Sequence, residues 1–409
     1  MSSREIIVWI SLGKENIPVG KLWFNSHKGK ETVSFEYDSA WLKHSEKFAL
    51  EPALELTEGT FHAAASVFGA IGDSAPDRWG RVLMRRAESK KAKAEKRTPI
   101  TLLEADYLLG VNDEARQGAL RFSLELDKAV FLAAKDQNPI PSLIKLPKLL
   151  SATERFLDNE ESAEDLKLLL APGSSLGGAR PKASVQDKDG TLAIAKFPRK
   201  DDEYNVVLWE AVALDLAKSA GINVPDWRIE KILRKPVLII KRFDRNNDER
   251  IPFLSAMSML GAKDNEEHSY LEIAYAIIQN GASPNHDLTE LWRRIVFSVM
   301  IANTDDHLRN HGFIYERYKG WRLSPVYDLN PTPIEIKPRI LSTAINYEDR
   351  SASLELAMSV IKEFRINKNR AIQISKEVAA AVKQWRKVAV KFGLSKVECD
   401  FMRSAFEWE

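Results

Sequence analysis

Two aspartates and an asparagine in the C-terminal half of the chain have the types and spacing of a phosphoryl-transfer site. Asp305 and Asn310 lie five positions apart in NTDDHLRNHGF, and Asp328 follows the apolar run LSPVY. In the catalytic loop of kinases, an aspartate and an asparagine at this offset act as proton acceptor and metal ligand. A further carboxylate after a strand suits Mg²⁺, which prefers oxygen ligands. The segment therefore predicts Asp305 as the base and Asn310 and Asp328 as Mg²⁺ ligands.

Transfer from ATP also needs a lysine that holds the phosphates and a loop whose backbone amides can approach them. Lys196 lies in the apolar run LAIAKF, and Glu210 follows in the next predicted helix as a candidate partner. Small residues that could cradle phosphate precede Lys196 in SSLGGARPK, at Ser175, Gly177, Gly178 and Ala179, followed by Lys182. A solvated lysine on an edge strand remains the alternative for Lys196, and a simple turn remains the alternative for the small-residue loop.

Two other chemistries fit the same region less well. His307 and His311 lie four positions apart, but zinc proteases need a glutamate after the first histidine, where this chain has Leu308. A Ser-His-Asp hydrolase would need a Gly-x-Ser-x-Gly elbow, which the sequence lacks. Phosphoryl transfer therefore remains the leading interpretation.

Apolar periodicity indicates the elements that would position these residues. A helix over 203–220 is predicted from its apolar spacing and from Gly221 as C-terminal cap. A helical stretch is also expected at about 62–94, with an interruption near 72–76. From about residue 248 onward helical patterns dominate, except at 312–327. Short β-branched or aromatic runs predict strands, as a meander at 4–12, 19–24 and 32–37, a hairpin after the small-residue loop, and further strands at 227–232 and 236–241.

These elements predict an α+β chain with a protein-kinase-like two-lobed fold behind an N-terminal α+β subdomain. We expect the subdomain at 1–130, a small β-rich lobe with the phosphate loop and hinge at 131–245, and a large helical lobe at 246–409. A linker is expected around Pro139 and Pro141.

Composition limits the cellular setting. The 409 residues are 44% hydrophobic and 29% charged, and no apolar run approaches the roughly 18 residues of a membrane span, so no membrane role is expected. The opening residues lack the pattern of a secretory signal, and the single cysteine, Cys399, can form no internal disulfide; both favour the cytoplasm. A net charge of +2, from 60 basic and 58 acidic residues, predicts no strong non-specific attraction to nucleic acid.

One local cluster departs from this charge balance. The stretch from Arg78 to Arg97 is rich in lysine and arginine and contains only Glu88 and Glu95 as acidic residues. A solvated helix face and a phosphate-contacting patch are both compatible with it.

The chain resembles the HipA family of bacterial toxin kinases, the kinase components of type II toxin–antitoxin modules. The similar stretches are SSLGGARPK, AIAKFP, INVP, IKRFDR, NTDDHLRNHGF and SPVYDLNPTP, with GALRF in the N-terminal region, so the likeness looks full-length. The resemblance implies ATP and Mg²⁺ as cofactors and the roles already given to Asp305, Asn310, Asp328 and Lys196. It adds a hinge from Lys241 to Phe243, His307 among the nucleotide-binding residues, and Ser175 as the loop serine that members autophosphorylate.

The resemblance also implies partners. In the family, a small HipB-like helix-turn-helix antitoxin carries the kinase onto operator DNA, and the protein substrate can be an aminoacyl-tRNA synthetase. The segment 254–270 and the pair Arg180-Pro181 depart from the pattern of well-known members. Two rival functions remain: a nucleotide-binding co-repressor with little catalysis, and an enzyme of the same fold that transfers AMP instead.

Overall fold

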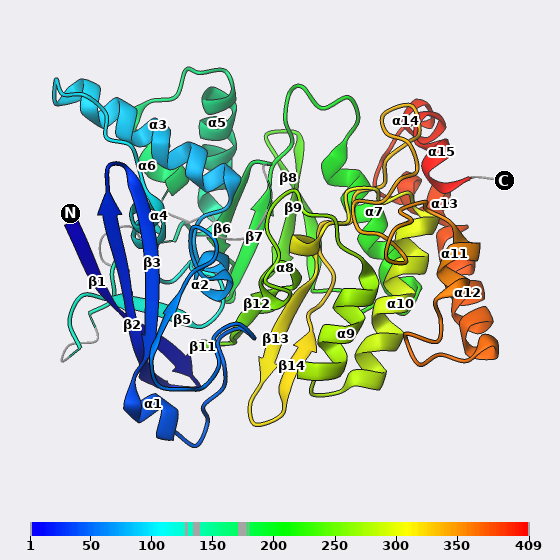
Figure 1. Ribbon diagram of the computed structural model, residues 1–409. Coiled ribbons are helices and arrows are strands. Elements are labelled where there is room, and N and C mark those ends of the chain that lie inside the picture. Colours follow the sequence, from blue (N-terminus) through cyan, green and yellow to red (C-terminus); the bar gives the residue numbers. More distant parts are fainter. Residues whose placement is uncertain (1, 127–129, 134–139, 171–177, 179, 408–409) are drawn as a thin grey trace. The chain divides into compact units, whose positions relative to one another are not determined.

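The computed structural model describes the whole chain except residues 1, 127–129, 134–139, 171–177, 179 and 408–409 (Figure 1). The described chain divides into two compact units. Unit 1 consists of Met1–Lys200 and Lys231–Leu254, and unit 2 of Asp201–Glu230 and Ser255–Glu409. Domain boundaries near residues 130 and 245 remain a prediction.

Unit 1 begins with a five-stranded antiparallel sheet in the order β4-β3-β2-β1-β5. The predicted meander is confirmed, because consecutive β1, β2 and β3 pair as hairpins. Strand β5 returns from much later in the chain to pair with β1, with Val8 opposite Phe122. The strands are β1 Ser2–Leu12, β2 Glu15–His27, β3 Lys30–Tyr37, β4 Thr60–His62 and β5 Leu120–Ser123.

The interruption expected near 72–76 in the helical stretch over 62–94 is present in unit 1. Pro76 and Asp77 separate two helices, and the Asp77 side chain accepts a hydrogen bond from Gly80 N at 2.8 Å to cap the second one. The interruption and the helix from Arg78 are therefore confirmed, whereas the predicted start near residue 62 is wrong, since the first helix begins at Gly69. The helices of the unit are α1 Ser39–Lys43, α2 Gly69–Asp73, α3 Arg78–Ala94, α4 Glu104–Gly110, η1 Leu143–Lys145, α5 Leu146–Leu157 and α6 Ala163–Leu170.

The predicted hairpin after the small-residue loop is also present in unit 1. Strands β6, Lys182–Gln186, and β7, Leu192–Lys196, pair antiparallel, and β7 pairs on its other side with β9, Lys235–Lys241. A two-residue hairpin follows, with β10 at Arg245–Asn246 and β11 at Glu249–Arg250. Strands β8, Trp227–Ile232, and β12, Phe253–Ser255, contain the boundaries between the units.

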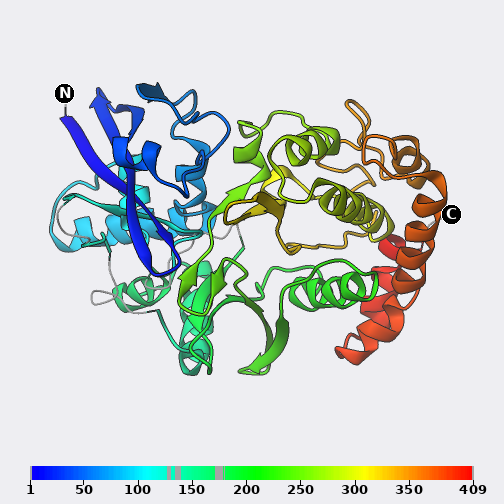
Figure 2. The same ribbon diagram turned by 90° about the horizontal axis from the view of Figure 1, so that it is seen from below.

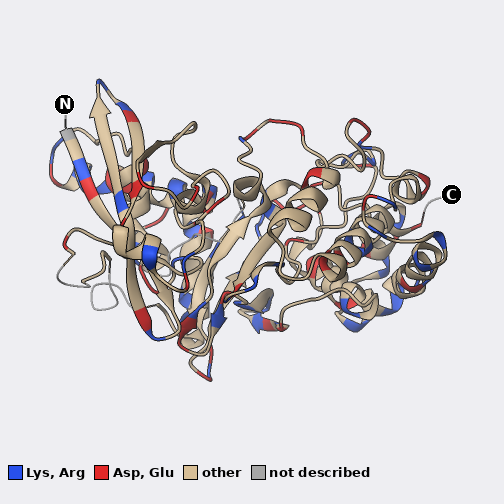
Figure 3. Cartoon of the chain, turned by 60° about the horizontal axis from the view of Figure 1, so that its bottom comes forward, with Lys and Arg blue, Asp and Glu red and all other residues tan. Residues whose placement is uncertain are grey.

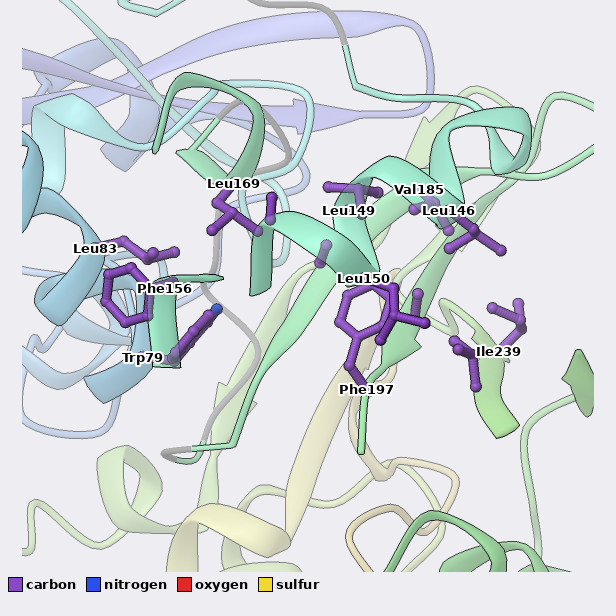
Figure 4. Close-up of a cluster of buried hydrophobic side chains, with 14 of the residues drawn as sticks. Trp79, Leu83, Leu146, Leu149, Leu150, Phe156, Leu169, Val185, Phe197 and Ile239 are labelled. Atoms are coloured by element: carbon purple, nitrogen blue, oxygen red, sulfur yellow. The ribbon is translucent and has the colours of Figure 1, made fainter. Parts of the chain in front are cut away.

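A buried apolar cluster joins α3, α5 and α6 to this sheet (Figure 4). Trp79 of α3 meets Phe156 of α5 edge to face, with ring centroids 5.0 Å apart. Val185 of β6 and Ile239 of β9 are buried in the same cluster. Burial of large apolar side chains is the main stabilising contribution to such a core. The N-terminal half of α3 therefore packs against the sheet that contains Lys196.

Unit 2 is mainly helical, as expected after residue 248. Helix α10 is its centre: most of its side chains are buried, and it packs against α9, α11 and α12 (Figures 1 and 2). The exception predicted at 312–327 is confirmed as a hairpin of β13, Gly312–Glu316, and β14, Gly320–Leu323. The helices are α7 Val206–Ser219, α8 Ala256–Met259, α9 Tyr270–Asn280, α10 Pro284–Met300, η2 Leu308–Asn310, α11 Leu354–Ser359, α12 Lys368–Val382, α13 Trp385–Lys391, α14 Lys396–Phe401 and α15 Arg403–Phe406.

Within the described residues, every helix is too short or too polar to cross a lipid bilayer.

Candidate active site

The loop after α10 is fixed from inside the protein. The chain leaves the helix through Ala302, whose φ of 48° lies in the left-handed region that non-glycine residues rarely adopt. Asn303 is fully buried, donates to Ser298 Oγ at 3.3 Å and accepts from Asn330 N at 3.1 Å. Strain of this kind persists only where the surroundings impose it, and it is common at functional sites. The loop is therefore held in one conformation.

The two adjacent aspartates of this loop have opposite environments. The side chain of Asp305 is 66% exposed, whereas that of Asp306 is 6% exposed. Asp306 accepts hydrogen bonds from Tyr270 Oη at 2.6 Å and Ser298 Oγ at 3.2 Å, and its Oδ1 lies 3.1 Å from His311 Nε2. Asp306 thus anchors the loop, and Asp305 is the carboxylate accessible to an incoming hydroxyl.

Electrostatics keep Asp306 ionised in its buried position. Burial alone would raise the pKa of this carboxyl group. The nearby His311 ring and the hydrogen bonds from Tyr270 and Ser298 outweigh burial and lower the pKa below its ordinary value. The same carboxylate, together with burial as the larger cause, raises the pKa of Tyr270 well above its usual range. A charged Asp306 is therefore part of the folded structure.

The two predicted metal ligands lie on neighbouring segments. Asn310 Nδ2 donates to Asp305 O at 3.0 Å, so the amide oxygen of Asn310 is the atom left for a cation. Tyr327 Oη donates to Arg309 O at 2.9 Å and ties the chain just before Asp328 to the chain just before Asn310. Asp328 has a φ of 60°, a second left-handed residue in the site. Carboxylate and amide oxygens are ligands that Mg²⁺ prefers, and the assignment of Asn310 and Asp328 as its ligands stays a prediction.

No cluster of three or more histidine, cysteine or acidic side chains suited to a metal occurs among the described residues. His307 and His311 make different contacts. The His311 ring contacts Asp306, whereas the backbone amide of His307 donates to Asp305 O at 2.9 Å. The Nδ1 atom of His307 is buried and has no hydrogen-bond partner in the described part of the chain. That ring is therefore compatible with its predicted place beside a nucleotide.

A segment that the sequence reasoning overlooked covers the same loop. Residues 332–343, here called the strap, contact three alternate carbonyl groups of the loop. Thr332 N donates to Ala302 O at 3.1 Å, Ser342 N to Thr304 O at 3.0 Å, and Thr343 Oγ1 to Asp306 O at 2.6 Å. The strap also brings Lys337 Nζ to 3.9 Å from Asp305 Oδ1. No motif in the sequence signals this contact, because it depends on the path of the chain after Asp328.

In unit 1, Lys196 is the last residue of β7. Ala193 and Ala195 point into the apolar cluster, so strand alternation places Lys196 on the opposite face, where it is half-buried. Glu210 is buried in α7 and belongs to unit 2. Its pairing with Lys196 therefore stays a prediction.

Lys182 has a partner that the sequence did not suggest. Its side chain is 6% exposed and its ammonium lies 2.9 Å from Asp77 Oδ2, just before α3. The Lys182 carbonyl accepts a hydrogen bond from Trp79 Nε1 at 3.2 Å. A buried lysine needs such a carboxylate. In the structure Lys182 anchors β6 to α3, and its expected contact with phosphate stays a prediction. Gly178 has a φ of 88°, and Ser175, Gly177 and Ala179 lie outside the described residues.

The segment expected to form the hinge is held by contacts with the N-terminal part of unit 1, and its contact with adenine stays a prediction. Lys241 is exposed and Phe243 half-buried, while Arg242 and Asp244 between and after them are buried. Asp244 accepts from Arg242 Nε at 2.8 Å and from Gly118 N at 2.7 Å. Burial would raise the pKa of Asp244, but the adjacent arginines lower it well below the usual range. The hinge is thus tied to the loop around Gly118.

Several cations of the basic stretch on α3 are paired with neighbouring carboxylates. Arg81 binds Glu104 through two hydrogen bonds of 2.7 Å. Arg86 and Lys90 both contact Glu161, whose side chain is 1% exposed. Basic and acidic residues are interspersed along the chain (Figure 3). These ion pairs favour the interpretation of a solvated helix face over a free phosphate-binding patch.

The fold and the sequence motifs of the chain are those of one protein family. The chain has a mixed α/β, kinase-like two-lobed fold. It belongs to the HipA family: the sequence model of the HipA-like C-terminal domain matches residues 174–385, and that of the HipA N-terminal domain matches residues 10–106. The family expected from the motifs is therefore confirmed.

Individual relatives agree with this assignment. A protein of Haemophilus influenzae named as a kinase is 28% identical over 182 residues, which cover 38% of this chain and 52% of that protein. The serine/threonine-protein kinase toxin HipA of Shewanella oneidensis is 23% identical over 233 residues, half of each chain. The chain thus spans about half the length of the curated relatives that it matches.

A solved structure shows the same fold over almost the whole chain. It is that of the Shewanella oneidensis HipA, HipB and operator DNA complex, with a TM-score of 0.71 and 16% identity, covering 97% of this chain and 94% of the other.

Proposed function

We propose that the protein is an ATP- and Mg²⁺-dependent serine/threonine protein kinase and the toxin of a toxin–antitoxin module. The observation that carries the proposal is the contrast between the two adjacent aspartates. Asp306 is buried in contact with His311, and it anchors a strained loop on which the Asp305 side chain is exposed to solvent. Such a rigid mounting suits a base that must meet an acceptor hydroxyl in one geometry.

The residues divide the chemistry among them. Asp305 orients the serine or threonine hydroxyl of the substrate and takes its proton as the oxygen attacks the γ-phosphorus. Asn310 and Asp328 would hold Mg²⁺, which neutralises charge on the phosphates when bound. Lys196 binds the α- and β-phosphates with Glu210 as its partner, and the backbone from Lys241 to Phe243 contacts adenine.

We further propose how the activity is regulated and directed. Ser175 is the autophosphorylation site, and a phosphate there would compete with ATP for the amides of its loop. A HipB-like helix-turn-helix antitoxin restrains the kinase and carries it onto DNA, and the cytoplasmic substrate is a translation-related protein such as an aminoacyl-tRNA synthetase. The support is a relative named as a kinase toxin and the fold shared with a HipA in complex with HipB and operator DNA.

The decisive experiment uses ATP labelled separately at the γ and α positions. A kinase transfers the γ label to protein, an enzyme that moves AMP transfers the α label, and a nucleotide-binding co-repressor transfers neither. The Asp305→Asn protein serves as control, since its side chain keeps the shape but is a poor base. Transfer of γ label by wild type alone would support the proposal, and its absence from both would refute it.

Mapping of the label tests the regulatory part. After incubation with ATP and Mg²⁺, mass spectrometry should find phosphate on Ser175 in the wild type and none in Asp305→Asn. ATP binding should fall as the modification accumulates. Phosphate elsewhere with Ser175 unmodified would exclude this mode of regulation while leaving the kinase activity in place.

A further inference from the structure

The strap holds a cation beside the predicted base. Lys337 Nζ lies 3.9 Å from Asp305 Oδ1 and 3.4 Å from Thr304 O. The backbone around Lys337 is fixed on both sides. Before it lies a turn in which the Ile336 and Lys337 amides donate to Pro333 O, and after it the Arg339 guanidinium donates to Val299 O. The position of Lys337 is therefore set by the fold.

Stability does not account for this arrangement. The side chains of Lys337 and Asp305 are 42% and 66% exposed, and ion pairs between exposed groups contribute only about 0–1 kcal/mol. A long, loose pair of this kind leaves the ammonium available to a stronger anion. The nearby cation Arg309 is directed elsewhere, since its Nη2 lies 3.0 Å from Asp264 Oδ1.

The distances fit a contact with the transferring group. A hydroxyl that Asp305 activates must lie roughly 2.6–3.2 Å from the carboxylate, and its oxygen must approach phosphorus at about 3–3.5 Å. The γ-phosphoryl oxygens would then lie within a few ångströms of the Lys337 ammonium, which is beside the same carboxylate. Positive groups aimed at the charge that develops on a phosphoryl group are a main source of catalysis.

We propose that Lys337 is a further catalytic residue, whose ammonium contacts the γ-phosphoryl oxygens of ATP and stabilises their charge during transfer. The inference rests on the proposed kinase function. In the step, the acceptor oxygen forms a bond to the γ-phosphorus as the bond from that phosphorus to the β–γ bridging oxygen breaks. The hydroxyl proton passes to Asp305, ADP leaves with the bridging oxygen, and Lys337 keeps its own proton throughout.

The test compares three variants of the full chain. Lys337→Met removes the charge at nearly constant volume, Lys337→Arg retains it, and Lys319→Met is the matched control at an exposed lysine paired with Glu316. We expect Lys337→Met to lower kcat about 100-fold, with a much smaller change in KM for ATP. Lys337→Arg should recover part of this loss, and Lys319→Met should match wild type.

A binding measurement makes the inference independent of turnover. In calorimetric titrations, loss of a γ-phosphate contact should reduce the preference for a non-hydrolysable ATP analogue over ADP about fivefold in Lys337→Met. The control should keep the wild-type preference. If the wild type transfers no γ-phosphate, the proposed function is refuted. The preference for the ATP analogue over ADP in Lys337→Met still tests whether Lys337 contacts the γ-phosphate.

Two results would overturn the inference. One is an unchanged kcat and an unchanged preference between the ATP analogue and ADP in Lys337→Met. The other is a lower kcat accompanied by a shifted acid limb of the pH–rate profile and an unchanged nucleotide preference. That pattern would mean that Lys337 only adjusts the ionisation of Asp305.

Discussion

Alanine substitution at two adjacent residues, Asp305 and Asp306, should separate catalysis from folding. Asp306→Ala removes the acceptor of the Tyr270 hydroxyl and the partner of His311, both of which are almost completely buried. Each buried polar group left without a partner costs about 1–3 kcal/mol, and Asp306→Ala leaves two such groups, the Tyr270 hydroxyl and the His311 ring. We therefore expect a loss of about 3–5 kcal/mol in the free energy of unfolding.

The neighbouring substitution should do the opposite. Asp305 is largely exposed and its ion pair with Lys337 is long, so Asp305→Ala should change stability by no more than about 0.5 kcal/mol. Its kcat should fall about 10²–10⁴-fold, the range for a lost general base. In thermal denaturation, the Tm of Asp306→Ala should therefore be about 10 °C below that of the wild type. The Tm of Asp305→Ala should be close to that of the wild type.

The pH dependence gives a further check. Because the pKa of Asp306 is lowered on folding, its stabilising contribution is present at neutral pH. It is lost as the pH falls below the unfolded value of about 4 toward the folded pKa. The difference in stability between wild type and Asp306→Ala should shrink accordingly on acidification. The reasoning would be refuted if Asp305→Ala stayed active while Asp306→Ala folded normally and lost all transfer.

Three other predictions concern separate parts of the chain. Burial raises the pKa of Glu51 to about 7, above its unfolded value, so stability should decline by up to about 3 kcal/mol as pH rises from about 4 to 8; chemical denaturation should show Glu51→Gln free of this decline. Arg86→Glu should cost about 2–4 kcal/mol in the same assay, because it sets a second negative charge beside the buried Glu161, whereas the exposed Lys91→Glu should be nearly neutral; equal effects would disprove the pairing. Asp328→Ala should weaken Mg²⁺-dependent ATP binding, measured by calorimetry with and without Mg²⁺, and an unchanged affinity would exclude it as a ligand.

Patterns within short segments were sufficient for much of the fold. The meander, the hairpin before Lys196 and the helix α7 all follow from the alternation or periodicity of apolar residues. The break between α2 and α3 was also expected near Pro76, whereas the start of the first helix was misplaced, because α2 begins only at Gly69. The motifs also led to the family, since their residues are contiguous in the chain.

The roles of individual side chains depended on contacts between distant segments. The sequence alone determined that Asp305, Asp306 and Asn310 lie together on one loop, because their spacing is local. Only the tertiary structure decided that Asp306 is the buried anchor, since Tyr270 reaches it from 36 residues away. It likewise gave Lys182 a carboxylate partner on α3 and brought Lys337 to the base. Burial and ion pairing are properties of packed surfaces, and no local pattern encodes which surfaces meet.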